Sequence, residues 1–326
     1  MYSQKVEKLH DVKKINSHST RERLRLWLLE HPELNPYRLS VGVTVDPNYV
    51  NPNKFSIGRA FQIVTSSIRI LPNFIIIGSS KSGTWAIHNY LLQHPDIDYS
   101  ARNIHFFEYV YSDKISWYKS HFPTKLHKSI VKTIHKRKCL VGEHTSMYLH
   151  HPLVPQRVKD CIPDVKLIIS LRNPIDRAYS NYHHHVREGF EKKTFEEAVF
   201  SEIKRMEIIK ENKNLQIKNP NFSNHVPFNY LRHGTYVDNI ENWLKKFPRE
   251  QLCIVENGDL SKNPQQVIDK LFMFLGLSRF KLKQEERWNV GKYKQMKEST
   301  RKTLADFFKP YNERLYKLLD QNFGWN

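Results

Sequence analysis

The sequence predicts a three-layer α/β/α fold built around a central parallel sheet. Three short apolar runs are typical of buried strands, and each is followed by a segment in which apolar residues recur with helical spacing. Chains in which strands alternate with helices form parallel sheets that helices cover on both faces. The three strand and helix pairs are Phe74–Ile77 with Trp85–His94, Val165–Ile169 with about Ile175–Val186, and Gln251–Glu256 with about Pro264–Leu275.

Two further elements extend this scheme. We expect a short strand at Cys139–Glu143 and an amphipathic helix over Thr303–Leu319, where apolar residues mark one face. Residues 1–70 carry several turn signals, and a helix is expected around Thr20–Glu30. The chain is therefore divided into an N-terminal extension, residues 1–70, and one domain, residues 71–326.

The charge of the chain favours anionic partners. Its 326 residues carry a formal net charge of +19, and the run Lys114–Lys138 holds eight Lys or Arg residues and no acidic one. Nucleotides, acidic glycans, nucleic acids and membrane surfaces all suit such a balance, and so does a plain solvated surface. No nucleic-acid-binding motif accompanies the charge, so nucleic acid is not an expected partner.

Cysteine usage and hydropathy restrict the class further. Cys139, Cys161 and Cys253 are far apart and form no CxxC pair, so we expect free thiols and no metal site. No apolar stretch approaches the length of a membrane-spanning helix. The charged segment Met1–Lys14 lacks the apolar core of a signal peptide. A cytoplasmic protein without a transmembrane segment is expected, and its oligomeric state stays open.

The segment after the first strand has the composition of a phosphate-binding loop. Small polar residues run from Gly78 to Thr84 between a buried strand and a helix, an arrangement that presents backbone N–H groups to an anion. In NTPase loops the Lys directly follows the second Gly, whereas here Lys81 precedes Gly83 by two positions. The loop therefore suits a 5′-phosphate bound without a metal ion.

Two segments resemble the nucleotide motifs of sulfotransferases that use 3′-phosphoadenosine-5′-phosphosulfate (PAPS). Residues 72–85, ending in Lys-Ser-Gly-Thr-Trp, resemble their 5′-phosphosulfate loop. Residues 171–180 resemble their 3′-phosphate motif, in which an Arg and a Ser eight residues later bind that phosphate, and Arg172 and Ser180 match this spacing. Residues 142–148, 234–236 and 289–293 match further motifs. The resemblance covers about residues 72–320 and is greatest to the heparan-sulfate-type and bacterial sulfotransferases.

This resemblance implies a sulfotransferase fold with a P-loop-like donor site, PAPS as the donor, 3′-phosphoadenosine-5′-phosphate (PAP) as the product and no required metal. Lys81 would neutralise the charge that develops on the bridging oxygen as the bond to sulfur breaks. The residues implied to bind the nucleotide are Lys81, Ser82, Gly83, Thr84, Trp85, Arg172, Ser180, Tyr236, Gly291, Lys292 and Tyr293.

The catalytic base departs from the family pattern. Relatives often carry Lys-Glu-x-His-Phe-Phe with that Glu as base, but Asn103 stands at the Glu position and cannot accept a proton. His105 matches the family His and is the leading candidate, because histidine titrates near neutral pH. Glu108 is a second candidate. His144, where relatives often have Lys, is a third and could instead donate a hydrogen bond to the sulfuryl group.

The acceptor is not identified by the sequence. A glycan hydroxyl or amine is favoured, since the run Lys114–Lys138 suits a polyanion and follows the His105 segment; a small metabolite is the alternative. Residues 1–70 could contribute to the acceptor cleft. Two other classes remain open: a nucleotide kinase, which the position of Lys81 opposes, and a binding-only relative, which Asn103 makes worth testing.

Overall fold

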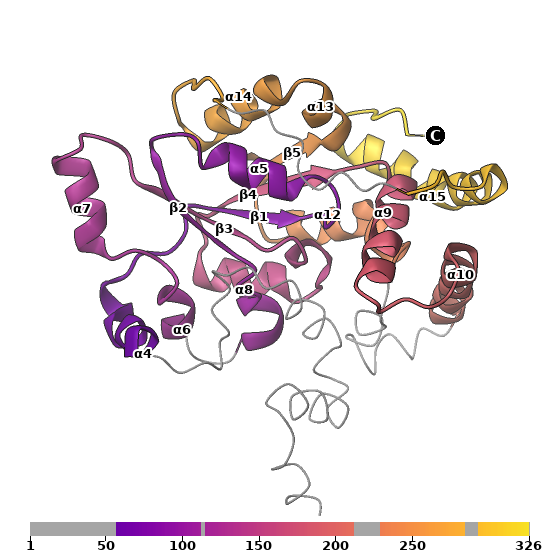
Figure 1. Cartoon of the computed structure of the whole chain (residues 1–326), viewed down its shortest axis with the longest axis horizontal. Coiled ribbons are helices and arrows are strands. Elements are labelled where there is room, and N and C mark those ends of the chain that lie inside the picture. Colours follow the sequence, from indigo (N-terminus) through magenta and orange to yellow (C-terminus); the bar gives the residue numbers. More distant parts are fainter. Residues whose placement is uncertain (1–56, 112–114, 212–228, 284–292, 326) are drawn as a thin grey trace, which may run out of the picture.

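The computed structural model describes residues 57–111, 115–211, 229–283 and 293–325. Its centre is a sheet of five parallel strands in the order β2-β3-β1-β4-β5, which confirms the expected fold class. Figure 1 shows the sheet between two layers of helices. The strands are β1 (Phe74–Gly78), β2 (Ile97–Arg102), β3 (Leu140–His144), β4 (Lys166–Leu171) and β5 (Leu252–Glu256).

The side chains of β1 alternate between two hydrophobic cores, one on each face of the sheet. Phe74 and Ile76 belong to the core under one layer of helices, and Ile75 and Ile77 to the core under the other. All four are fully buried, as an apolar strand at the centre of a doubly covered sheet must be. The first layer comprises α5 (Thr84–Leu91), α13 (Asn257–Lys262) and α14 (Pro264–Leu275); the second comprises α6 (Ile115–Lys119), α8 (Val154–Cys161), α12 (Tyr236–Leu244) and the C-terminal part of α15 (Glu298–Leu319).

A third apolar cluster extends the fold beyond the carboxyl ends of the strands. Ile175, Phe195 and Phe308 come from three different helices and pack together there. The helices are α9 (Pro174–Arg187), α10 (Phe195–Glu211) and α15. This cluster fixes α9 against the domain, and only two residues separate the end of β4 from the start of α9. Short helical turns complete the fold: η3 (Phe106–Val110), η4 (Tyr148–His150), η5 (Arg232–Gly234) and η6 (Arg249–Gln251).

The order of the strands places β1 at a topological switch point. The chain leaves β1 toward β2 and β3 on one side, and later returns to β4 on the other. Crevices that bind ligands open at such points, beyond the carboxyl ends of the strands. The loop after β1 and the start of α9 after β4 therefore lie at one end of the sheet.

The opposite end of the sheet carries the peripheral elements α4 (Ile57–Val64), η2 (Thr65–Ile68) and α7 (Lys125–Thr133). The N–H of Lys138 donates to Asp96 Oδ1 at 3.1 Å, and these residues immediately precede β3 and β2. In Figure 1, α7 and α9 accordingly lie at opposite ends of the molecule. The expected helix around Thr20–Glu30 lies outside the described residues.

Candidate functional site

Contacts with β4 shape the loop after β1. The N–H of Ser79 donates to the Ser170 carbonyl at 2.8 Å, and the Ser170 hydroxyl donates to the Ser82 carbonyl at 2.5 Å. Lys81 has a φ of 67°, a left-handed conformation that is rare for a residue with a side chain and is concentrated at functional sites. Two anchors on one strand thus hold a tight loop, with Lys81 at its turn.

Gly83 joins this loop to α5 and adopts a φ of 79° as the N-cap. A Cβ at this position would run into the side-chain amide of Asn257, at the start of α13. Glycine is thus required both by the backbone conformation and by the neighbouring side chain. The first N–H groups of α5 have no partner within the helix, so they are available to an anion.

Arg172 brings the end of β4 to the loop. Its Nη1 donates to the Lys81 carbonyl at 3.3 Å, while its own carbonyl accepts from the buried Tyr236 hydroxyl at 2.9 Å. Tyr236 therefore fixes the backbone that carries Arg172. Sequence reasoning placed Lys81, Arg172 and Tyr236 in one site, and the structure brings all three together.

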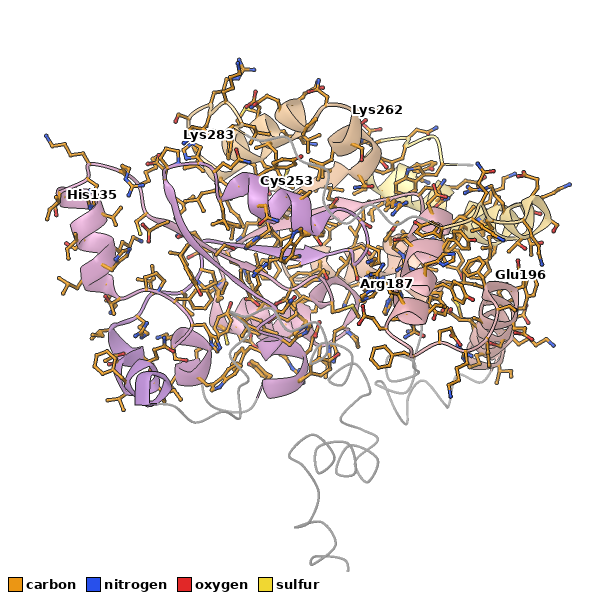
Figure 2. The ribbon with its side chains drawn as sticks, viewed as in Figure 1. His135, Arg187, Glu196, Cys253, Lys262 and Lys283 are labelled. Carbon is orange, nitrogen blue, oxygen red and sulfur yellow. The ribbon has the colours of Figure 1, made fainter. Side chains whose placement is uncertain are left out.

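The Lys81 ammonium is surrounded by other cations. Burial, followed by the charges of Arg187 and Arg172, lowers its pKa to about 8, against the opposing effect of Glu188. Burial also lowers the pKa of His184 to about 3, and the Lys81 charge contributes to this shift. Cations held together without a matching set of carboxylates favour an anionic ligand. Arg187, labelled on α9 in Figure 2, was not identified from the sequence.

Helical spacing aligns Ser180 with this cationic group. Ser180, His184 and Arg187 follow one another at i, i+4 and i+7 along α9, so they lie on one face of the helix. Because His184 and Arg187 are electrostatic neighbours of Lys81, this face is directed toward the loop. Arg187 could have been identified from the sequence, because it follows Ser180 by seven residues and so falls on the same face of the predicted helix.

Tyr293 packs on the neighbouring face of α9. Its ring stacks on His183 with 4.3 Å between centroids, and its edge meets Tyr179 at 5.3 Å. The Tyr179 hydroxyl donates to the Lys294 carbonyl at 2.9 Å. This late segment is therefore anchored on the helix that carries Ser180. Gly291 and Lys292 lie outside the described residues.

A cavity of about 360 Å³ opens beside Arg172, between the ends of β4 and β5 and the C-terminal segment. Asn257, Lys262 and Trp325 contribute to its walls. Trp85, expected to contact the nucleotide, does not line this cavity. The Arg102 guanidinium lies 4.2 Å from the centre of the Trp85 ring, on the side of β2 and β3.

The segment after β2 holds a buried histidine and carboxylate pair. His105 Nδ1 lies 2.7 Å from Glu108 Oε2, and both side chains are nearly enclosed. Asn103 and His105 have φ values of 50° and 54°, so this turn is left-handed at two residues. The N–H of Asn103 donates to the His144 carbonyl at 2.8 Å, which anchors the turn to β3.

Glu143 supports this pair from β3. It is fully buried and accepts hydrogen bonds from Thr145 Oγ1 at 2.8 Å and from the Tyr118 hydroxyl. Burial raises its pKa to about 7, although hydrogen bonds from Tyr118, Tyr148 and Thr145 oppose that shift. With its oxygens engaged in this way, Glu143 is a support for the surrounding residues rather than a free base.

His144 lies on the other face of β3, against α5. Its ring is 5.4 Å from that of His88 and 6.4 Å from that of Trp85. Burial, reinforced by His88, Arg102 and His105, keeps its pKa well below the ordinary value. Neither ring nitrogen has a hydrogen-bond partner within the part of the chain that the structure describes. The two histidine candidates thus differ: His105 has a carboxylate partner and His144 has cationic neighbours.

A group with metal-ligand chemistry lies away from this site. Oxygen, nitrogen and sulfur atoms of Asp98, His127 and Cys139 lie within 4.8 Å of one another. His127 Nε2 is 2.6 Å from Asp98 Oδ2, and Lys128 and Arg137 lie close enough to influence the pKa of Cys139. These residues occupy the amino-terminal end of the sheet, so a cation held there would not reach Lys81.

The sulfotransferase domain family matches residues 71–311. The membrane-associated sulfotransferase kil1 of Dictyostelium discoideum is 27% identical, with 80% of this chain and 68% of that protein covered. Heparan sulfate glucosamine 3-O-sulfotransferase 3B1 of Homo sapiens is 26% identical, with coverage of 80% and 66%. The chain thus spans about two thirds of the length of these curated relatives.

A solved structure agrees with the sequence comparisons. The sulfotransferase from Alicyclobacillus acidocaldarius is 28% identical, has a TM-score of 0.59, and is matched over 78% of this chain and 98% of its own. The described helices include none that is both long and apolar enough to cross a membrane. Because the family match covers most of the sequence and includes every strand of the sheet, this chain belongs to the sulfotransferase domain family.

Proposed function

We propose that this chain transfers a sulfuryl group from PAPS to a hydroxyl or amine of a glycan. One observation carries the proposal: Lys81 and Arg172, from the two nucleotide motifs, meet at the carboxyl ends of adjacent parallel strands, with the charge of Arg187 close to Lys81. A kinase would need Mg²⁺ beside its phosphates, and in NTPase loops the Lys directly follows the second Gly, whereas here Lys81 precedes Gly83 by two positions.

The residues around the loop fit an anionic nucleotide. The N-terminus of α5, from Gly83 to Trp85, offers backbone N–H groups to the 5′-phosphosulfate, and Lys81 offers a charge. Arg172 and Ser180 would hold the 3′-phosphate, for which the guanidinium supplies a rigid fork of donors. Tyr236 would act indirectly by fixing the Arg172 backbone. Ser82, Thr84, Gly291, Lys292 and Tyr293 retain their expected roles in this proposal.

His105 is proposed as the base because Glu108 determines which nitrogen carries its proton. A carboxylate can only accept a hydrogen bond, so the 2.7 Å contact requires the proton on Nδ1 and leaves Nε2 to accept another. His144 is a poorer base, since a group whose pKa is far below the working pH holds a proton weakly. Neutral His144 is suited instead to donating a hydrogen bond to a sulfuryl oxygen.

In this proposal the transfer is a single displacement at sulfur. The acceptor oxygen or nitrogen forms a bond to sulfur as the bond between sulfur and the bridging phosphate oxygen breaks. The acceptor proton passes to His105 Nε2, and the negative charge left on the phosphate is stabilised by Lys81. The products are the sulfated acceptor and PAP, and His105 later releases its proton to solvent.

The acceptor class rests on the relatives, several of which are sulfotransferases named for heparan sulfate. The basic run at Lys114–Lys138 no longer contributes to this inference, because α7 lies at the opposite end of the sheet from Lys81. A small-molecule acceptor is the alternative proposal. The cytoplasmic location, and any role of residues 1–70 at the acceptor cleft, stay predictions.

The proposal is tested by incubating the chain with PAPS and desulfated heparan sulfate. Sulfated glycan and PAP should appear in equal amounts, and the Lys81→Ala variant should form neither. Transfer only to small phenols or alcohols would replace the glycan by the small-molecule alternative. Tight PAP binding without turnover on any acceptor would instead identify a binding-only relative.

A further inference from the structure

Three side chains with different donor atoms meet at the amino-terminal end of the sheet. A carboxylate oxygen of Asp98, a ring nitrogen of His127 and the sulfur of Cys139 all lie within 4.8 Å of one another. They come from β2, from the first turn of α7 and from the residue before β3. Zn²⁺ accepts this mixture of oxygen, nitrogen and sulfur ligands, whereas Mg²⁺ and Ca²⁺ prefer oxygen alone. The donor set therefore suits zinc.

Backbone hydrogen bonds on both sides of Cys139 hold it beside β2. The Lys138 N–H donates to Asp96 Oδ1 at 3.1 Å, and the Leu140 N–H donates to the Asp96 carbonyl at 2.9 Å. Cys139 lies between these two anchors, and its side chain is buried. The position of the sulfur is thus fixed by the fold and needs no rearrangement to serve as a ligand.

A shift of register directs the carboxylate toward α7. Ile97 on β2 pairs with Leu140 on β3, and the next pair joins Tyr99 to Val141. Asp98 is therefore an extra residue on β2. Extra residues of this kind re-aim a side chain relative to the regular strand. The carboxylate reaches across to α7, where its Oδ2 lies 2.6 Å from the imidazole Nε2.

The start of α7 positions His127. The His127 N–H donates to Oγ1 of the N-cap Thr124 at 3.1 Å, and an isolated β-bridge joins Thr124 to Arg69. In a tetrahedral zinc site the nitrogen and oxygen ligands would be about 3.3 Å apart, given bonds of about 2.0–2.1 Å. The exposed fraction of the His127 side chain is 46%, so its ring is free to move outward by this difference.

The charges of the three ligands also match a divalent cation. The Asp98 carboxylate and a Cys139 thiolate together carry two negative charges, which Zn²⁺ would cancel. Lys128 and Arg137 lie close enough to influence the thiol, and the Arg137 guanidinium also donates to the Pro95 carbonyl. These cations would oppose a site that stayed positively charged, so binding depends on both anionic ligands.

We propose that Asp98, His127 and Cys139 bind Zn²⁺, with a water molecule as the fourth ligand. The ion would join α7 to β2 and to the start of β3. The helix has little other attachment, since Val131 alone is buried between residues 125 and 136. Because the ion binds only the folded arrangement of the three ligands, it stabilises the native state by mass action.

This zinc site is separate from the proposed sulfotransferase site. His135, just beyond the end of α7, and Arg187, whose charge acts on Lys81, lie on opposite sides of the molecule in Figure 2. The proposed ion therefore takes no part in sulfuryl transfer. PAP affinity should be the same with and without zinc.

The test is titration of the untagged full chain with Zn²⁺ in competition with a chromogenic chelator, followed by titration with Co²⁺. One ion per chain is expected, and the Co²⁺ complex should show the near-ultraviolet absorption of a thiolate ligand. Cys139→Ser, Asp98→Asn and His127→Ala should each lower the affinity about tenfold or more. Cys161→Ser and His135→Ala are the matched controls and should bind as the wild type does.

Thermal unfolding supplies a second measurement. Zn²⁺ should raise the melting temperature of the wild type and of both controls, and should leave that of the His127→Ala variant unchanged. This variant changes a half-exposed side chain, so its loss of zinc binding is not explained by a damaged core. Unchanged PAP affinity in each variant verifies that the domain is folded.

Three outcomes would overturn the proposal. The first is a wild-type chain that takes up no stoichiometric Zn²⁺ in competition with the chelator. The second is binding that survives both Cys139→Ser and His127→Ala, which would place the ion elsewhere on the chain. The third is a Co²⁺ complex without thiolate absorption, which would leave Asp98 and His127 as an ordinary hydrogen-bonded pair.

Discussion

His105 and Glu108 form a buried pair in which Nδ1 of the imidazole lies 2.7 Å from Oε2 of the carboxylate. The pair occupies a left-handed turn that follows β2, and Asn103 in the same turn stands where relatives often have a glutamate base. The carboxylate orients the imidazole ring. In the proposed mechanism the role of the glutamate base passes to His105, two residues away.

Replacing His105 by Ala should reduce kcat by about 10²–10⁴-fold, the usual contribution of a positioned base. PAP affinity should stay within about twofold, because His105 has no place in the proposed nucleotide site. Steady-state kinetics and calorimetry separate the two effects. The exposed His135 on the far side of the molecule supplies the control, and its Ala variant should behave as wild type.

Asn103→Glu should partly restore turnover to the His105→Ala variant, since it reinstates the residue that relatives use as base. A β-carbon already tolerates the φ of 50° at this position, although the change from Asn costs some stability. Single-turnover rates of the double variant measure the rescue. A double variant no faster than His105→Ala would argue that the turn after β2 does not face the acceptor.

Deprotonation of Lys81 should weaken PAP binding at alkaline pH. Its pKa is lowered to about 8, so the free protein begins to lose this positive charge as the pH rises through that value. The bound anion stabilises the ammonium, hence affinity should fall progressively above pH 8 and level off below it. Lys81→Arg keeps its charge and should flatten the profile. Identical pH profiles for both proteins would exclude Lys81 from contact with the nucleotide.

Ala variants of Gly83 and Gly189 can separate the cost of backbone strain from an effect on PAP binding. Both have a left-handed φ, 79° and 76°, but a Cβ meets Asn257 only at Gly83 and nothing within 4 Å at Gly189. Each Ala variant should lose about 1 kcal/mol of unfolding free energy through the backbone conformation. Gly83→Ala alone should also weaken PAP binding. Equal PAP affinity in the two variants would count against the loop as the phosphate site.

The sequence predicted the centre of the fold well because its strands are unambiguous. β1 is fully buried, and β4 and β5 are buried apart from Lys166 and Glu256 at their ends, so each has a short apolar run at its centre. The helix α14 begins and ends at the predicted residues. The strand β2 was missed, because at the edge of the sheet it alternates buried with partly exposed positions and includes Asp98 and Arg102. A short, polar edge strand has little hydrophobic signal to detect.

The sequence predicted the residues proposed to bind the nucleotide more completely than it predicted the residues proposed to act in catalysis. Lys81 and Arg172 each follow a recognisable strand, so parallel pairing was enough to bring them together. The partnership of His105 with Glu108 depends on a turn with two left-handed residues, which no local pattern specifies. The pairing of Arg102 with Trp85, and the position of α7 at the opposite end of the sheet, likewise arise only from tertiary packing.

The site where Lys81 and Arg172 meet is proposed to recognise a nucleotide that carries a 3′-phosphate. Calorimetric titration with PAP in the absence of Mg²⁺, with ADP as the control ligand, tests it most directly. PAP should bind with an affinity that ADP does not reach. The Arg172→Ala variant should bind PAP about tenfold or more weakly, because it has lost a charged contact to the phosphate. Equal affinity for PAP and ADP, or an Arg172→Ala variant that binds PAP as well as wild type, would contradict it.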